Sequence, residues 1–309
     1  MINAIKITNI VTGDFAQFDR SNGHFIIDEI DWDIPSVSLE TYHIPYQIGD
    51  VLAGVSIGSR KPMITGYVVA DIADGTGMTW KEYYNEQQKM INGYKKQLNK
   101  LFSVFQDIKL EIGNCYMICR ATSPILYSTK EKENNEVLCK FSVELLSVDS
   151  TFHKDSEVIQ LASVSKMFHF PTTFNAVTFG SLQRKESVII NNTGDVETGC
   201  VIVISAVGGS VINPEFYNVD TGQSIGFELQ LDDGDELLIN TNKGEENAIV
   251  HDVSESKVYS ALGNLKLNSE FLQISQGNST YAYRVEQASS SNVKASIEYS
   301  ERFFNLEDI

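Results

Sequence analysis

The sequence predicts a mostly β protein with one long helix, in which an α+β domain is followed by an all-β sandwich. In the first third of the chain, short β-like runs such as "AIKITNIV" and "PMITGYVVADIA" alternate with turns. One amphipathic stretch with helical spacing follows them. Beyond Phe168 the chain is a series of short strands separated by turn residues about every 8 to 12 positions, which is typical of a sandwich or jelly roll.

The long helix is predicted over about residues 79–105. From Trp80 to Phe105, apolar residues recur at spacings of three and four, the period of an amphipathic helix that packs on a core. Thr79 and Glu82 form a capping-box pattern at its start. Gly93 lies inside the helix and costs about 1 kcal/mol relative to alanine, so the helix is expected to depend on tertiary packing.

These patterns divide the chain into two predicted domains. Residues 1–167 form the α+β domain, and residues 168–309 form the β-sandwich. The stretch "VKASIEYSERFFNL" near the C-terminus has a strand pattern that suits either domain, so a return of residues 292–309 to the first domain is the alternative. A chain of 309 residues is long enough for two ordinary domains.

The composition is that of an acidic globular protein. A net charge of −17 and a pI near 4.7 argue against nucleic acid as the main partner, because binding a polyphosphate normally needs a basic surface. The start "MINAIKITNIV" lacks the basic and long apolar regions of a secretory signal, and no run reaches the ~18 apolar residues of a membrane span. We therefore expect a protein that is made in the cytoplasm and is not inserted in a membrane.

No pattern predicts a catalytic, cofactor-binding or metal-binding residue. Gly75 and Gly77 fit the first two glycines of a dinucleotide-binding loop, but Trp80 stands at the third position, which must be small. The five histidines and four cysteines show no zinc spacing, so the cysteines are expected to be reduced thiols. Two distant carboxylates on a β-sandwich, as in some glycosidases, stay open as the basis of a hydrolase.

The stretch "LQLDDGDELLINTNKG", residues 229–244, is the strongest candidate for reactive carboxylates. It fails as a calcium loop, because aligning either of its glycines with the loop glycine leaves apolar or basic residues at ligand positions. Apolar residues alternate on both sides of Asp233-Gly234, which predicts a two-residue type I′ hairpin. We then expect Asp232→Ala and Asp235→Ala to be nearly silent, and Gly234→Val to impair folding because a β-branched residue resists positive φ.

The same region carries a specific resemblance, strongest over residues 186–244. It contains an Asn-Thr-Gly turn, the apolar strand "CVIVISAV", an "NP" pair, the pattern "NVDTG" and then "GDELLIN". The first half is compatible, with "RKPMITGYV", a helix running into "QLNKLF", and "LLSVDSTF". In these features the sequence resembles the distal tail protein (Dit) family of long-tailed phages and related prophage or tailocin particles.

The resemblance implies a structural role and no catalysis. Proteins of this family form a ring, typically of six copies, at the distal end of the tail. The ring joins the tail tube to the tail hub and adhesion apparatus and leaves a channel for DNA. The first domain is then the ring-forming domain, and the second is galectin-like. The implied partners are further copies of the chain, the tail tube protein, the hub protein and a receptor-binding protein, with no sequence-specific nucleic acid. The implied location is the virion, after assembly in the bacterial cytoplasm.

Galectin likeness raises the question of sugar binding. Galectins bind galactosides with an H-x-N-P-R stretch, and the nearest match is "VINPE", in which Val211 replaces the histidine and Glu215 the arginine. Only Asn213 and Pro214 remain, so we expect no galectin-type binding; glycan binding that mapped to Asn213 would contradict this. Two other functions stay open: a carbohydrate- or surface-binding sandwich module, and a less favoured β-sandwich glycoside hydrolase.

Overall fold

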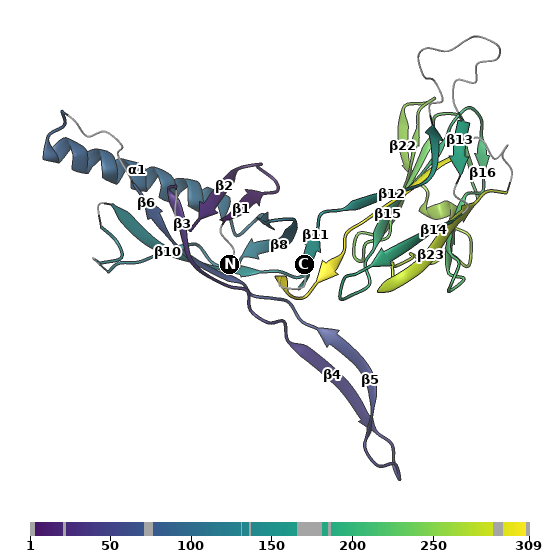
Figure 1. The fold of residues 1–309 in the computed structure, drawn as a ribbon, viewed down its shortest axis with the longest axis horizontal. Helices are drawn as coiled ribbons and strands as arrows, with labels where there is room; N and C mark the ends of the chain where they lie inside the picture. The colour runs from purple at the N-terminus through teal and green to yellow at the C-terminus, as the bar shows by residue number, and fades with distance from the viewer. Residues whose placement is uncertain are drawn as a thin grey trace. The chain divides into compact units, whose positions relative to one another are not determined.

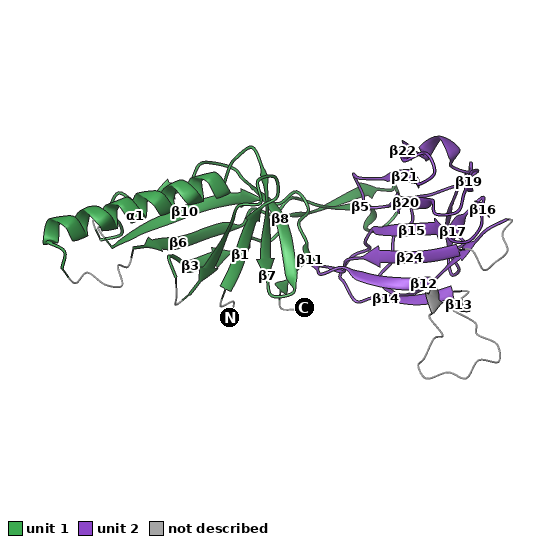
Figure 2. Cartoon of the chain, turned by 90° about the horizontal axis from the view of Figure 1, so that it is seen from above, with its two compact units in different colours: residues 1–153, 304–306 green, residues 154–303, 307–309 purple. Residues whose placement is uncertain are grey.

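The computed structural model describes residues 4–20, 23–70, 77–130, 132–135, 137–165, 181–184, 187–286 and 293–306. The chain divides into two compact units, residues 1–153 with 304–306 and residues 154–303 with 307–309 (Figure 2). The predicted domain boundary at 167/168 lies outside the described residues. Strands dominate both units, and the one α-helix of the described chain lies in the first, which confirms the predicted fold class (Figure 1).

The first unit consists of a large sheet, a helix and a separate pair of strands. Its elements are β1 (Ala4–Asn9), β2 (Phe15–Asp19), β3 (Phe25–Asp31), β4 (Val37–His43), β5 (Asp50–Ile57), β6 (Met63–Val69), α1 (Trp80–Leu101), β7 (Asp107–Ile112), β8 (Cys115–Ala121), β9 (Leu126–Tyr127), β10 (Leu138–Leu146) and β11 (Phe152–Lys154). In the sheet these strands follow the order β11-β8-β7-β1-β2-β3-β6-β10-β9. Strands β4 and β5 form a two-stranded sheet of their own.

Helix α1 begins where the sequence predicts and ends earlier. Thr79 Oγ1 accepts a hydrogen bond from the N–H of Glu82, and the Glu82 carboxylate accepts one from the N–H of Thr79, so the predicted capping box is confirmed. The last helical residue is Leu101, and Phe105, where the helix was predicted to end, lies beyond it and is 87% exposed. The side chain of Asn9 donates to the Leu101 carbonyl, one of the acceptors that a helix end leaves without an internal partner. No helix in the described ranges is both long and apolar enough to cross a bilayer.

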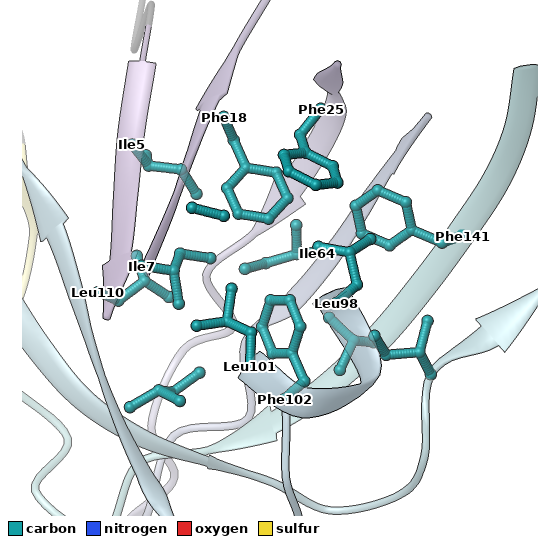
Figure 3. Close-up of a cluster of buried hydrophobic side chains, with 14 of the residues drawn as sticks. Ile5, Ile7, Phe18, Phe25, Ile64, Leu98, Leu101, Phe102, Leu110 and Phe141 are labelled. Carbon is teal, nitrogen blue, oxygen red and sulfur yellow. The ribbon is translucent and has the colours of Figure 1, made fainter. Parts of the chain in front are cut away.

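The core of the first unit lies between α1 and one face of the sheet. Alternate residues of the strands point to this face, so Ile5 and Ile7 of β1 are both buried. The helix packs against β1, β2 and β6 and contributes Leu98 and Leu101 to the buried cluster. Figure 3 shows the cluster, with Ile5, Ile7, Phe18, Phe25, Ile64, Leu98, Leu101, Phe102, Leu110 and Phe141 labelled.

The second unit consists of antiparallel sheets. Its elements are β12 (Glu157–Ser165), β13 (Ser181–Arg184), β14 (Ser187–Asn192), β15 (Cys200–Ala206), β16 (Val211–Ile212), β17 (Glu215–Asn218), β18 (Ser224–Gly226), β19 (Gln230–Leu231), β20 (Glu236–Asn240), β21 (Asn247–Asp252), β22 (Lys257–Ser260), η1 (Leu262–Asn264), β23 (Gly277–Arg284), β24 (Val293–Tyr299) and β25 (Arg302–Phe303). A seven-stranded sheet has the order β13-β12-β24-β15-β20-β21-β22, and a four-stranded sheet has the order β14-β23-β17-β18.

The two larger sheets of the second unit enclose one hydrophobic core. The seven-stranded sheet contributes Ile202, Ile239 and Ile297, while the four-stranded sheet contributes Phe216 and Tyr281 to the same cluster. The rings of Phe216 and Tyr281 stack at a centroid distance of 5.8 Å. Two antiparallel sheets with a shared core make this unit the predicted β-sandwich.

Candidate assembly surface

The cysteine side chains are part of the buried structure. All four cysteines are buried, and burial raises the pKa of Cys119 and of Cys200 to about 12. A thiol with so high a pKa stays protonated at neutral pH and is a poor nucleophile. In the part of the chain that the structure describes, no group of three or more His, Cys, Asp or Glu residues is placed to hold a metal ion.

The acidic stretch at Asp232–Asp235 is a turn, but the predicted type I′ hairpin is wrong. The N–H of Asp235 donates to the carbonyl of Asp232 at 2.9 Å, which closes the turn. A type I′ turn needs positive φ at both central residues; of the two, Gly234 has it, at +97°, and Asp233 does not. The strands on either side also belong to different sheets, because β19 pairs with β16 whereas β20 pairs with β15 and β21. The turn therefore carries the chain from one sheet to another.

Within this turn the aspartates have different environments. The Asp235 carboxylate is buried and accepts hydrogen bonds from the N–H groups of Asp232 and Val253, at 2.9 and 3.0 Å. Asp233 accepts from the N–H of Gly208. Asp232 is exposed, and its carboxylate accepts a hydrogen bond from the side-chain amide of Gln230 at 2.7 Å. The expectation that Asp235→Ala is nearly silent therefore has to be replaced.

We expect Asp235→Ala to lower the free energy of unfolding by about 1–3 kcal/mol, because it leaves two backbone N–H groups in a buried place without their acceptor. Asp232→Ala is the matched control in the same turn and should stay within about 0.5 kcal/mol of the wild type. Urea denaturation of both variants measures the difference. Equal midpoints for the two variants would refute the structural role of Asp235.

The polar side chains of "VINPE", residues 211–215, form hydrogen bonds and ion pairs with other residues of the chain. Asn213 donates through Nδ2 to Glu286 at 2.7 Å. The buried carboxylate of Glu215 is paired with Arg284 at 2.6 Å and with Lys266 at 3.3 Å. Burial alone would raise the pKa of Glu215, but hydrogen bonds led by the one from Arg284 hold it below its ordinary value. These contacts support the absence of galectin-type binding, which stays a prediction.

The feature of the first unit that needs a partner is the β4–β5 hairpin, residues 36–58, which we call the arm. Figure 1 shows it as a separate two-stranded ribbon. Every residue of β4 is exposed. The N–H of Gly58 donates to the carbonyl of Ser36 at 2.8 Å and closes the base of the arm. An isolated two-stranded sheet is at best marginally stable in water, so an arm of this kind gains stability when another surface covers it.

One face of the arm is apolar. The strand register places Val37 opposite Ile57 and Leu39 opposite Val55, and directly opposed residues share a face. A bulge between Glu40 and Thr41 of β4 adds one residue to β5 and brings Leu52, opposite Thr41, onto the same face. We define the apolar face by five residues: Val37, Leu39, Leu52, Val55 and Ile57.

The apolar face is open to solvent in the single chain. Its five side chains are 42 to 61% exposed, whereas buried core residues such as Ile64 are at 0%. Complete burial of one such side chain is worth about 1.5–3 kcal/mol. Five side chains that are each about half exposed thus offer roughly 4–8 kcal/mol to a covering surface, before the cost of association is subtracted. The other face of the arm carries Ser38 and Ser56, opposite each other near the base, and Tyr42 opposite Val51 nearer the tip. A contiguous exposed apolar patch such as the apolar face is typical of an interaction site.

Comparisons with known proteins show which family model and which solved structures this chain resembles. Residues 193–303 match the family model described as the siphovirus-type tail component, C-terminal domain. The crystal structure of phage SPP1 Dit (gp 19.1) matches with 13% identity and a TM-score of 0.61, over 97% of this chain and 99% of that one. A chain of the phage P2 baseplate matches with 12% identity and a TM-score of 0.51, over 97% and 98%. At these identities the two structures show a shared fold. A comparison with curated protein sequences gives no match.

Residues 193–303, which lie in the second unit, thus match the class of siphovirus-type tail components, and the whole chain shares the fold of SPP1 Dit. The family model over residues 193–303 and the fold shared with SPP1 Dit agree with the family that the sequence resembles.

Proposed function

We propose that this chain forms a six-membered ring at the distal end of a phage tail, which joins the tail tube to the tail hub and surrounds a channel for DNA. The observation that carries the proposal is the exposed apolar face of the arm, because a chain with such a face needs a covering partner. An arm that lies on a different surface of the next identical copy makes a head-to-tail contact. A series of such contacts closes into a ring when the rotation between copies allows it.

The partners and location follow from the same proposal. SPP1 Dit, which shares the fold, is described as a paradigm of the hub adsorption apparatus in phages that infect Gram-positive bacteria. By analogy, we assign this chain a place in the virion, between the tail tube protein and the hub, with a receptor-binding protein as a further neighbour. Its role there is structural and not enzymatic. The buried thiols and the acid groups bound within the fold are in keeping with that role.

Native mass spectrometry and negative-stain imaging of the purified protein test the proposal. The expected result is a closed ring of six copies with a central opening. A protein that stays monomeric at every concentration, and that forms no ring in its parent particle, would overturn it.

A further inference from the structure

The tip of the arm, residues 44–48, combines an unusual backbone with fully exposed apolar side chains. The N–H of Gln47 donates to the carbonyl of Ile44 at 3.1 Å, which closes a four-residue turn. Pro45 is the second residue of this turn, and Tyr46 is the third with φ of +68°. Proline at the second position and positive φ at the third are the features of a type II turn.

The backbone conformation at position 46 is unfavourable for tyrosine. Positive φ favours glycine or asparagine, because a larger side chain crowds the backbone there. Gly49, three residues further along, has positive φ as well, at +88°, and is the residue type that such a backbone favours. A residue held in an unfavoured conformation points to a function of its side chain. The side chain of Tyr46 is therefore the feature to explain.

The single chain gains nothing from the Tyr46 ring. The side chains of Tyr46 and Ile48 are fully exposed, and Ile44 beside them is also exposed. Tyrosine is enriched among the few residues that dominate binding energy at interfaces, because it offers a large apolar ring with few rotatable bonds and a hydroxyl. The tip thus has the composition of an anchor that inserts into another surface.

We infer that Tyr46 is the anchor residue by which the arm binds a second copy of this chain, in an apolar depression with a hydrogen-bond acceptor for the hydroxyl. This inference rests on the proposed ring. The tip continues the arm whose apolar face lies on the neighbouring copy. A strand of seven residues such as β4 spans about 23 Å, so the tip reaches well across that same neighbour.

The charge of the arm is compatible with a second copy as the occupant. Each chain carries a net charge of −17, so contacts between copies are opposed wherever like charges meet. Residues 44–48 and the five residues of the apolar face carry no charged side chain. Between them, His43 and Asp50 lie opposite each other on the same face, and the Asp50 carboxylate is 3.2 Å from His43 Nδ1. The contact surface therefore presents a single carboxylate to an identical acidic chain, and that carboxylate has a histidine beside it.

Tyr46→Gly tests the anchor, because glycine suits the positive φ and keeps the turn. The expected result is an unchanged or slightly higher thermal midpoint, with a dissociation constant of the assembly raised at least about tenfold. Gln47→Ala, at the neighbouring exposed position, is the matched control and should assemble as the wild type does. Sedimentation velocity over a concentration series measures the constants. Assembly of Tyr46→Gly that equals the wild type would overturn the inference.

A photoreactive residue tests the occupant. With p-benzoylphenylalanine in place of Tyr46, irradiation of the assembled protein should give a covalent dimer of this chain, with the crosslinked peptide identified by mass spectrometry. A crosslink to a different protein in the parent particle would overturn the second copy as the occupant. If Val55→Asp abolishes assembly while Tyr46→Gly leaves it intact, the anchor fails and the ring stands. If neither variant changes the assembly, the arm has no part in it, and the support for the proposed ring fails as well.

Discussion

Val55→Asp is expected to give a folded chain that no longer assembles. Val55 lies in the apolar face of the arm and is 57% exposed, so the single chain loses little when the side chain changes. In the assembly, the new carboxylate would be buried against an apolar surface without a partner, which costs several kcal/mol. A loss of about 3 kcal/mol at each contact raises its dissociation constant by roughly 100-fold. Native mass spectrometry should show monomers at concentrations where the wild type forms rings.

Ser56→Asp is the matched control for this experiment. Ser56 is the next residue of the same strand and points to the opposite face, where it lies across from Ser38. The substitution adds the same charge at nearly the same distance from the tip, so any general effect of charge on association appears in both variants. We expect Ser56→Asp to assemble. Equal loss of assembly in the two variants, or no loss in either, would show that the apolar face is not the contact surface.

The fold was largely predictable because its signals are local. The capping box of Thr79 and Glu82 fixes the helix start, and it depends on four neighbouring residues only. The helix end was placed too late, because Phe105 continues the apolar spacing although Asn9, far away in the sequence, caps Leu101. In the same way, Asp233-Gly234 indicates a turn but does not say whether the strands on either side pair with each other. Contacts between distant segments decided both differences.

The arm was the part that sequence patterns did not reveal. The run "VLAGVSI" of β5 has a β-like composition, but the sequence patterns predict no strand over β4. Val37 and Leu39 alternate with Ser38 and Glu40, which is a usable strand signal. The signal does not distinguish a face that packs on the chain's own core from one that packs on another molecule, because both need the same residues. The exposed positions of the side chains in the structure make that distinction.

Glu301 is a buried carboxylate of the second unit with several hydrogen-bond donors. It is 4% exposed and lies between β24 and β25. Its two oxygens accept from Lys154 Nζ at 2.8 Å and from both the N–H and the hydroxyl of Thr193, at 2.8 and 2.7 Å. The Lys154 N–H also donates to the Glu301 carbonyl. One residue thus joins three segments that are far apart in the sequence.

We expect Glu301→Gln to lower the free energy of unfolding of the second unit by about 1.5–3 kcal/mol at neutral pH, the range for hydrogen bonds to charged groups. The amide keeps the size of the side chain but turns an N–H donor toward one of the groups that donated to the carboxylate. Glu298→Gln, at an exposed position of β24, is the control and should stay within about 0.5 kcal/mol of the wild type. Urea denaturation measures both.

The pH dependence of this difference identifies its electrostatic origin. Burial raises the pKa of Glu301, but the hydrogen bonds from Lys154 and Thr193 outweigh it and hold the pKa below its ordinary value. The folded chain therefore binds this proton more weakly than the unfolded chain does. The stabilisation is fully present above the unfolded pKa of about 4.3 and is lost as the pH falls through the folded pKa. The stability curves of the wild type and Glu301→Gln should accordingly be farthest apart at neutral pH and converge below about pH 4. Curves that stay parallel across this range would mean that Glu301 acts through its shape and not through its charge.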